Sequence, residues 1–211
     1  MPAADAPTPL SHSTVVHWSK KKDQDKRLRI MWEAEKLFAR DGFQKTDLTR
    51  VAENAAVGKS TIYKYFPTKD DLLRTVVREN FHYMATLALS QLIGEGDPAQ
   101  RLSRTCFTVA DFLDQNKAFC TVLIKESGQL MEEIQTIYSA ILFDNVQLAE
   151  AFFAHFKTNK LLPPIETQGL LKIIIDLTIG LLYTWVLSGN YTLRSQVDFY
   201  LDLFKLNPEK A

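Results

Sequence analysis

The residues from Lys59 to Lys64 carry the most specific chemistry in this sequence, because all but Ile62 have a side-chain hydrogen-bond donor. A lysine ammonium can reach the O6 and N7 atoms of guanine, hydroxyl groups can contact bases or phosphates, and a tyrosine hydroxyl can donate to a phosphate. If Ile62 and Phe66 point inward, the outward face carries donors suited to DNA, at Lys59, Ser60, Thr61, Tyr63 and Lys64.

The sequence contains no pattern for catalysis or metal binding that is as specific as this segment. The four histidines are scattered, and Cys106 and Cys120 lack metal-ligand spacing. The sequence has no G-x-S-x-G, P-loop or G-x-G-x-x-G motif. Adjacent carboxylates such as Glu132 and Glu133 diverge on a helix. The sequence therefore predicts no enzyme, no metal site and no cofactor.

Two short helices must position the donor-rich face. Apolar spacing predicts a helix over 25–40, a two-turn helix over 48–55 and a third over 59–66, with a three-residue break at 56–58 and a stop at Pro67. The two short helices are too small to be stable alone, so they must pack on the first. This arrangement is a helix-turn-helix, whose second short helix can enter the DNA major groove.

The rest of the chain also predicts helices and no strands. Gly and Pro number only eight each, too few for an all-β fold with a turn every ten residues or so. We therefore expect an all-α protein of about nine helices, in which a three-helix DNA-binding domain precedes a larger helical domain. The further helices are expected over 68–93, 98–115, 117–127, 130–158, 166–188 and 194–206.

Charge and composition divide the chain into three parts: a flexible basic arm over 1–24, a helix-turn-helix domain over 25–75 and a helical domain over 76–211. The first 80 residues hold 15 basic and 11 acidic side chains, although the whole chain is neutral. A local basic excess favours a local polyanion partner. The cluster from Lys20 to Arg29 could follow the DNA backbone or enter the minor groove, or could simply be solvated.

The segment from Gly42 to Leu73 resembles the DNA-binding domain of TetR-family transcriptional regulators. Three positions depart from the family pattern: Ala56 replaces the turn glycine, Gly58 replaces a serine cap, and Ser60 replaces a residue that is often glycine. Ala56 would be strained if the turn needs a positive φ. The matching positions are Gly42, Phe43, Thr46, Val51, Ala52, Ala55, Val57, Ile62, Tyr63, Tyr65, Phe66, Lys69 and Leu72.

The resemblance implies roles for individual residues. It places Thr46, Tyr63, Tyr65 and Lys69 where family members contact the DNA backbone, and the segment from Lys59 to Lys64 where they contact base edges. If Lys69 binds a phosphate, its replacement by alanine should lower the salt dependence of DNA binding by about one unit.

The segment over 166–188 predicts a homodimer. It is apolar almost all round, so one domain core cannot readily cover it. With the last helix it resembles the four-helix-bundle dimer interface of TetR-family proteins. A two-fold dimer would present its recognition helices about 34 Å apart to a palindromic operator. The expected interface residues are Ile174, Leu177, Leu181, Val197, Tyr200, Leu201 and Phe204.

Aromatic residues are dense in the predicted larger domain. Phenylalanine at helical spacing is more often core than pocket, but the resembling family places its effector cavity among these helices. The resemblance therefore implies a small hydrophobic or aromatic effector. The candidate effector-binding residues are Phe112, Phe119, Cys120, Met131, Tyr138, Asn145, Phe152 and Trp185.

These observations favour a cytoplasmic DNA-binding regulator, a repressor by the commoner behaviour of the resembling family. Residues 1–19 lack a secretory signal, and Lys172 and Asp176 interrupt the longest apolar run, so no membrane contact is expected. Effector binding is expected to change the separation of the recognition helices, transmitted by the helix over 68–93. The alternative is a helical small-molecule-binding or adaptor protein that does not bind DNA.

Overall fold

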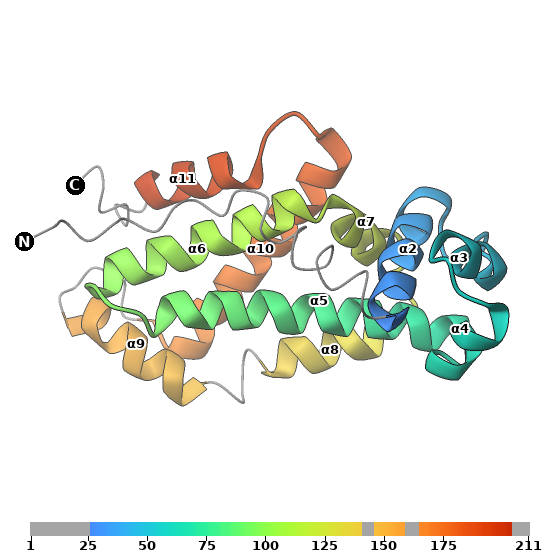
Figure 1. The fold of residues 1–211 in the computed structure, drawn as a ribbon. Coiled ribbons are helices and arrows are strands. Elements are labelled where there is room, and N and C mark those ends of the chain that lie inside the picture. Colours follow the sequence, from blue (N-terminus) through green and yellow to red (C-terminus); the bar gives the residue numbers. More distant parts are fainter. Residues whose placement is uncertain (1–25, 141–145, 159–164, 204–211) are drawn as a thin grey trace, which may run out of the picture. The chain divides into compact units, whose positions relative to one another are not determined.

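A computed structural model describes residues 26–140, 146–158 and 165–203 of this chain. Over these residues the chain forms ten α-helices and no strand, which confirms the predicted fold class. It divides into two compact units, Met1–Val76 and Val77–Ala211. Each unit is built from its own helix contacts (Figure 1).

The first unit contains α2 (Lys26–Asp41), α3 (Leu48–Asn54), α4 (Lys59–Tyr65) and the first turns of α5 (Lys69–Leu92). Helix α2 contacts both α3 and α4, and these two short helices contact each other. Burial of the apolar faces of all these helices makes one small core. Its fully buried side chains include Ile30, Leu37, Phe38, Val51, Ile62 and Phe66.

Local hydrogen bonds fix where α3 and α5 begin. The Asp47 carboxylate accepts a hydrogen bond from the Thr49 N–H at 2.8 Å, so Asp47 is the N-cap of α3. Before α5, the Thr68 hydroxyl and the Asp71 N–H are 3.0 Å apart, and the Asp71 carboxylate accepts the Thr68 N–H at 3.2 Å. This reciprocal pair is a capping box. Helix α5 then continues from the first unit into the second.

The second unit contains the remainder of α5 and six further helices. Asp97 caps α6, and Pro98 occupies its first turn, as the sequence predicted. Of the helix expected over 130–158, the structure describes two parts, α8 and α9, and residues 141–145 lie outside the described residues. The bounds are α6 (Pro98–Gln115), α7 (Lys117–Lys125), α8 (Met131–Ser139), α9 (Val146–Thr158), α10 (Thr167–Ser188) and α11 (Leu193–Leu203).

Two aspartates of α6 hold the N-terminal end of α11. The Asp114 carboxylate accepts hydrogen bonds from the N–H groups of Leu193 and Arg194, at 2.8 and 3.0 Å. Asp111 forms an ion pair of 2.5 Å with the Arg194 guanidinium. These bonds satisfy amides that the first turn of a helix leaves free, and they attach α11 to α6, on which it packs (Figure 1).

Helix α10 leaves most of its apolar side chains at least partly exposed. It contacts α7, α9 and α11, but Thr167, Leu170 and Trp185 are its only buried residues. Among the described helices, only α10 is long and apolar enough to cross a membrane by length and composition.

Candidate nucleic-acid interface

Helix α4 presents a polar face to solvent because its apolar side chains are buried in the core. Ile62 has no exposed surface and Phe66 only 2%. On the other side, Lys59, Ser60 and Lys64 are exposed. The structure therefore shows the amphipathic arrangement that the sequence predicted for this short helix.

Two tyrosines extend the polar face of α4. Tyr63 is 46% exposed and Tyr65 is 42% exposed, which is unusual for side chains of this size. Each offers a ring for van der Waals contact and a hydroxyl that can donate to a phosphate oxygen. Thr61 is half-buried. The structure thus brings six of the predicted DNA-binding residues, Lys59 to Thr61 and Tyr63 to Tyr65, onto one helix.

The turn before α4 places a non-glycine residue in the left-handed region. Ala56 has a φ of 52°. Its N–H donates to the Glu53 carbonyl, and the Val57 N–H donates to the Ala52 carbonyl, both at 3.0 Å. This hydrogen-bond pattern is a Schellman motif, which favours glycine at the position of Ala56. The strain expected from the sequence is therefore present in the turn that leads to α4.

Gly58 begins α4 with an extended backbone and no side-chain cap. Its carbonyl accepts the N–H groups of Thr61 and Ile62, at 2.9 and 3.3 Å. A serine at this position would supply the hydroxyl that Gly58 lacks, and the space beside Gly58 is open enough for a Cβ.

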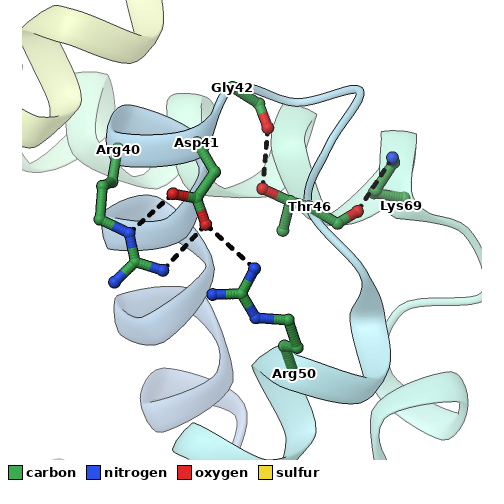
Figure 2. A network of polar contacts seen from close by, with 6 residues as sticks. All are labelled: Arg40, Asp41, Gly42, Thr46, Arg50 and Lys69. Atoms are coloured by element: carbon green, nitrogen blue, oxygen red, sulfur yellow. Dashed lines mark hydrogen bonds and ion pairs between the residues drawn. The ribbon is translucent and has the colours of Figure 1, made fainter.

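A polar network joins the C-terminal end of α2 to α3. The Asp41 carboxylate is 2.7 Å from the Arg40 Nε and 3.2 Å from a nitrogen of Arg50 (Figure 2). The hydrogen bond from Arg40 is the main reason that the pKa of Asp41 falls to about 2, and the charge of Arg50 acts in the same direction. The carboxylate therefore stays ionised and links the end of α2 to α3.

The connection from α2 to α3 is a turn that we call the α2–α3 turn, residues 42–46. Gly42 begins it with a φ of 84°. The Thr46 hydroxyl donates to the Gly42 carbonyl at 2.8 Å (Figure 2). The Thr46 N–H donates to the Phe43 carbonyl at 3.2 Å. Thr46 is only 3% exposed. Its side chain is buried in the unit and does not lie on the polar face of α4.

The Lys69 ammonium also lies at the α2–α3 turn. Its Nζ is 2.8 Å from the Phe43 carbonyl oxygen, 3.2 Å from that of Gln44 and 3.1 Å from that of Thr46. The charge also lies 4.4 Å from the centroid of the Phe43 ring. This contact could not be predicted from residue types, because its acceptors are main-chain atoms. The predicted phosphate contact at Lys69 stays a prediction.

The predicted arm over 1–24 lies outside the described residues, which begin at Lys26. The basic cluster from Lys20 to Arg29 is therefore described only in part. Lys26 is exposed on the first turn of α2. The Arg27 guanidinium carbon lies 5.8 Å from the centroid of the Phe66 ring. At least one cation of the cluster from Lys20 to Arg29 is therefore in contact with the core that supports α4.

The predicted effector-binding residues lie in different surroundings in the second unit. Phe112, Phe119 and Cys120 are buried together, and the Cys120 thiol donates to the Leu113 carbonyl at a sulfur–oxygen distance of 3.6 Å. The rings of Phe112 and Phe119 meet edge to face, 6.2 Å apart. This group is a packed aromatic cluster around α6 and α7.

The other effector candidates are not part of that cluster. Phe152 packs with Phe153, Phe156 and Leu170, in a core formed by α9 and α10. Trp185 is buried with the Lys117 ammonium 5.4 Å from its ring centroid. Met131 is 50% exposed, Tyr138 is half-buried, and Asn145 lies outside the described residues. The eight residues therefore do not form a single described group.

The predicted dimer-interface residues differ in their exposure to solvent. Ile174 and Leu177 are 43% and 38% exposed, whereas Leu201 is buried within its own chain. Leu181, Val197 and Tyr200 are half-buried, and Phe204 lies outside the described residues. The prediction omitted several exposed apolar residues that their types alone could have suggested. These are Ile173, Ile179, Tyr183 and Leu187 on α10, and Phe199 and Leu203 on α11.

The acidic, histidine and cysteine side chains of the described residues offer no metal site. No cluster of three or more His, Cys, Asp or Glu residues among them could hold a metal ion. Burial raises the pKa of the Cys106 thiol to about 11, so this thiol is protonated at neutral pH. The exposed polar face of α4 is therefore the candidate functional site.

Comparison with known sequences matches the segment that contains α4. Residues 30–76 match the sequence model of a family described as bacterial regulatory proteins, tetR family. The HTH-type transcriptional regulator YuxN of Bacillus subtilis is 27% identical over 127 residues, 59% of this chain and 43% of YuxN. RutR of Escherichia coli K12 is 26% identical over 71% of this chain and 70% of RutR. The match thus spans about two fifths of YuxN.

Solved structures show that the likeness in fold extends over both units. The fatty acid degradation regulator FadR of Bacillus halodurans matches with a TM-score of 0.73 and 20% identity, over 87% of this chain and 95% of FadR. FadR of Bacillus subtilis, solved in complex with stearoyl-CoA, matches with a TM-score of 0.66 and 16% identity, over 84% and 96% of the two chains. At these identities the likeness concerns the fold.

Proposed function

We propose that this chain, a TetR-family transcriptional regulator with a helix-turn-helix DNA-binding domain, is a homodimeric repressor that binds a palindromic operator and is released by a small, largely hydrophobic effector. The observation that carries the proposal is the face of α4, whose donors are exposed while Ile62 and Phe66 are buried beneath it. The proposed DNA-contacting residues are Lys59, Ser60, Thr61, Tyr63, Lys64 and Tyr65.

Lysines and hydroxyls have different tasks in this proposal. Lys59 and Lys64 would neutralise phosphates or reach guanine edges, whereas the Tyr63 and Tyr65 hydroxyls would donate to phosphates. Contacts to phosphate fix the position of the helix, and contacts to base edges select the sequence. A short helix with both kinds of donor is suited to sequence-specific recognition.

The exposed apolar side chains of α10 and α11 support the dimer. A single copy leaves Ile173, Ile174, Leu177 and Ile179 exposed on α10, which is costly in water. A second copy related by a two-fold axis would cover the same surface on both protomers. The two-fold symmetry would in turn place one α4 at each half of a palindrome.

The buried aromatic clusters support a hydrophobic effector. The Phe112 and Phe119 cluster and the Phe152 cluster both lie in the second unit, away from α4 in the sequence. The FadR complex with stearoyl-CoA makes acyl-CoA the first probe to use. Release would require the effector to bind better to a state of the dimer in which the two α4 helices no longer fit the operator.

Selection of bound fragments from random DNA, followed by gel-shift titration, tests the proposal. The expected result is a palindromic consensus, bound by a dimer with an affinity that stearoyl-CoA or another bound hydrophobic ligand lowers. Failure to enrich any sequence, with the protein folded and dimeric, would favour the helical adaptor or small-molecule-binding alternative. Equal operator affinity with and without every ligand that binds would defeat the release mechanism. The proposed location is the cytoplasm, where DNA is accessible.

A further inference from the structure

We propose that Lys69 is a positioning residue of the DNA-binding domain, which orders the α2–α3 turn through its main-chain carbonyls and does not bind a phosphate. This inference rests on the proposed DNA binding, and it replaces the role that the resemblance implied for Lys69. The first argument is the number of donors. An ammonium has three N–H groups, and three carbonyl oxygens lie within 3.2 Å of the Lys69 Nζ.

The carbonyl contacts leave little of the ammonium for DNA. The Phe43 ring also lies beside the ammonium, with its centroid 4.4 Å from the Nζ. This ring is itself fixed, because Phe43 is 5% exposed and packs on Phe38 with the ring centroids 5.6 Å apart. Contacts with a ring face and with carbonyl dipoles both favour a localised positive charge. The site therefore matches the chemistry of a lysine ammonium.

The position of the three carbonyls explains why the turn needs a cation. The oxygens of Phe43, Gln44 and Thr46 converge on one point, so their partial negative charges repel one another in the absence of a cation. Within the turn itself, the Phe43 carbonyl accepts the Thr46 N–H, and the Gly42 carbonyl accepts the Thr46 hydroxyl. The Lys69 charge completes this set and links the start of α5 to the turn.

The turn matters for DNA binding because α3 starts directly after it. Asp47, the N-cap of α3, follows Thr46, and α3 packs on both α2 and α4. A loosened turn would let α3 shift, and α3 carries the hydrophobic contacts that support α4. Lys69 would thus act on the donor face of α4 through the turn and α3, without touching the operator.

Salt dependence separates the two roles of Lys69. We would measure the operator affinity of the full dimer over a range of salt concentrations, for wild type, Lys69→Met and Lys64→Met. A positioning residue predicts that Lys69→Met lowers affinity about tenfold at every salt concentration with an unchanged slope. Lys64→Met, the exposed control on α4, should lower the slope by about one unit. A slope lowered by one unit in Lys69→Met would overturn the proposal.

Lys69→Arg supplies a second, independent test. Arginine keeps the positive charge, so a phosphate contact predicts operator affinity close to wild type. The planar guanidinium cannot direct its donors at three converging carbonyls, so a positioning role predicts a loss similar to that of Lys69→Met. Full affinity in Lys69→Arg would contradict the inference.

Hydrogen exchange of the free protein tests the turn without any DNA. In Lys69→Met, the Thr46 N–H and the first amides of α3 should exchange faster than in wild type, whereas the amides of α10 should be unchanged. Unchanged exchange at the turn would reject the positioning role. Because this measurement needs no operator, it distinguishes a failure of this inference from a failure of the proposed DNA binding.

Discussion

Helix α4 buries its apolar side chains and exposes its donors, whereas α10 exposes isoleucine, leucine and tyrosine side chains along most of its length. The seven residues of α4 are supported by α2 and α3 of the same unit, so its exposed surface is already polar in one chain. The 22 residues of α10 find too few apolar partners in one chain. The contrast indicates that the exposed surface of α4 suits a polar ligand and that the exposed surface of α10 suits an apolar partner.

The largest effect is expected when a charged residue is placed on the apolar surface of α10. Leu177→Asp should weaken dimerisation by more than about a hundredfold, because an aspartate at an apolar interface loses its water without gaining a partner. Sedimentation velocity measures the change. Leu148→Asp, at a similarly exposed leucine on α9, is the control and should stay dimeric. A dimer of unchanged affinity in Leu177→Asp would place the interface elsewhere.

A smaller effect is expected on the polar side of the comparison. Tyr63→Ala should lower operator affinity about tenfold and leave the dimer folded, because one exposed hydroxyl and one ring are lost from α4. Tyr63→Phe should lose part of this affinity if the hydroxyl donates to a phosphate. Gel-shift titration and size-exclusion chromatography together separate lost contact from lost structure. Wild-type affinity in Tyr63→Ala would remove Tyr63 from the interface.

The turn before α4 provides a stability test. Ala56→Gly should raise the free energy of unfolding by about 1 kcal/mol, because glycine adopts the positive φ at this position without strain. Ala55→Gly is the matched control. Ala55 has a φ of −76° and is buried, so the same change there should destabilise the protein. Urea unfolding of both variants measures the effect, and the same sign in both would reject the explanation.

The smallest effect concerns pH and Asp41. Its pKa is lowered to about 2 from an ordinary 3.8, so the folded protein is stabilised above pH 3.8 and loses this contribution as the pH falls toward 2. The difference in unfolding midpoint between wild type and Asp41→Asn should therefore shrink as the pH decreases below about 4. Glu53→Gln, at an exposed carboxylate of α3, is the control. A difference independent of pH would contradict the role of the Asp41 charge.

The sequence predicted best those features that depend on neighbouring residues. The cap at Asp97 with Pro98, the short α3 and α4, and the inward Ile62 and Phe66 follow from local patterns of capping and apolar spacing. The helix expected over 130–158 contains both α8 and α9, and residues 141–145 between them lie outside the described residues.

The candidate site was predictable in part for the same reason. The donors of α4 are side chains, and their exposure follows from the burial of the residues between them. The Lys69 contact could not be predicted, because its partners are main-chain carbonyls of residues more than twenty positions away. The sequence does not distinguish effector-binding phenylalanines from core phenylalanines, because those that fill a core and those that line a pocket have the same helical spacing.

The bonds from Asp111 and Asp114 to the start of α11 bear on the order of assembly in the cell. Because α6 of the same chain holds α11 in place, a nascent protomer can complete this part of its fold before it meets another copy. Association would then join two preformed surfaces in a bimolecular step, whose rate rises with the square of the protomer concentration. Synthesis rate would thereby set how quickly newly made copies become competent to occupy the operator.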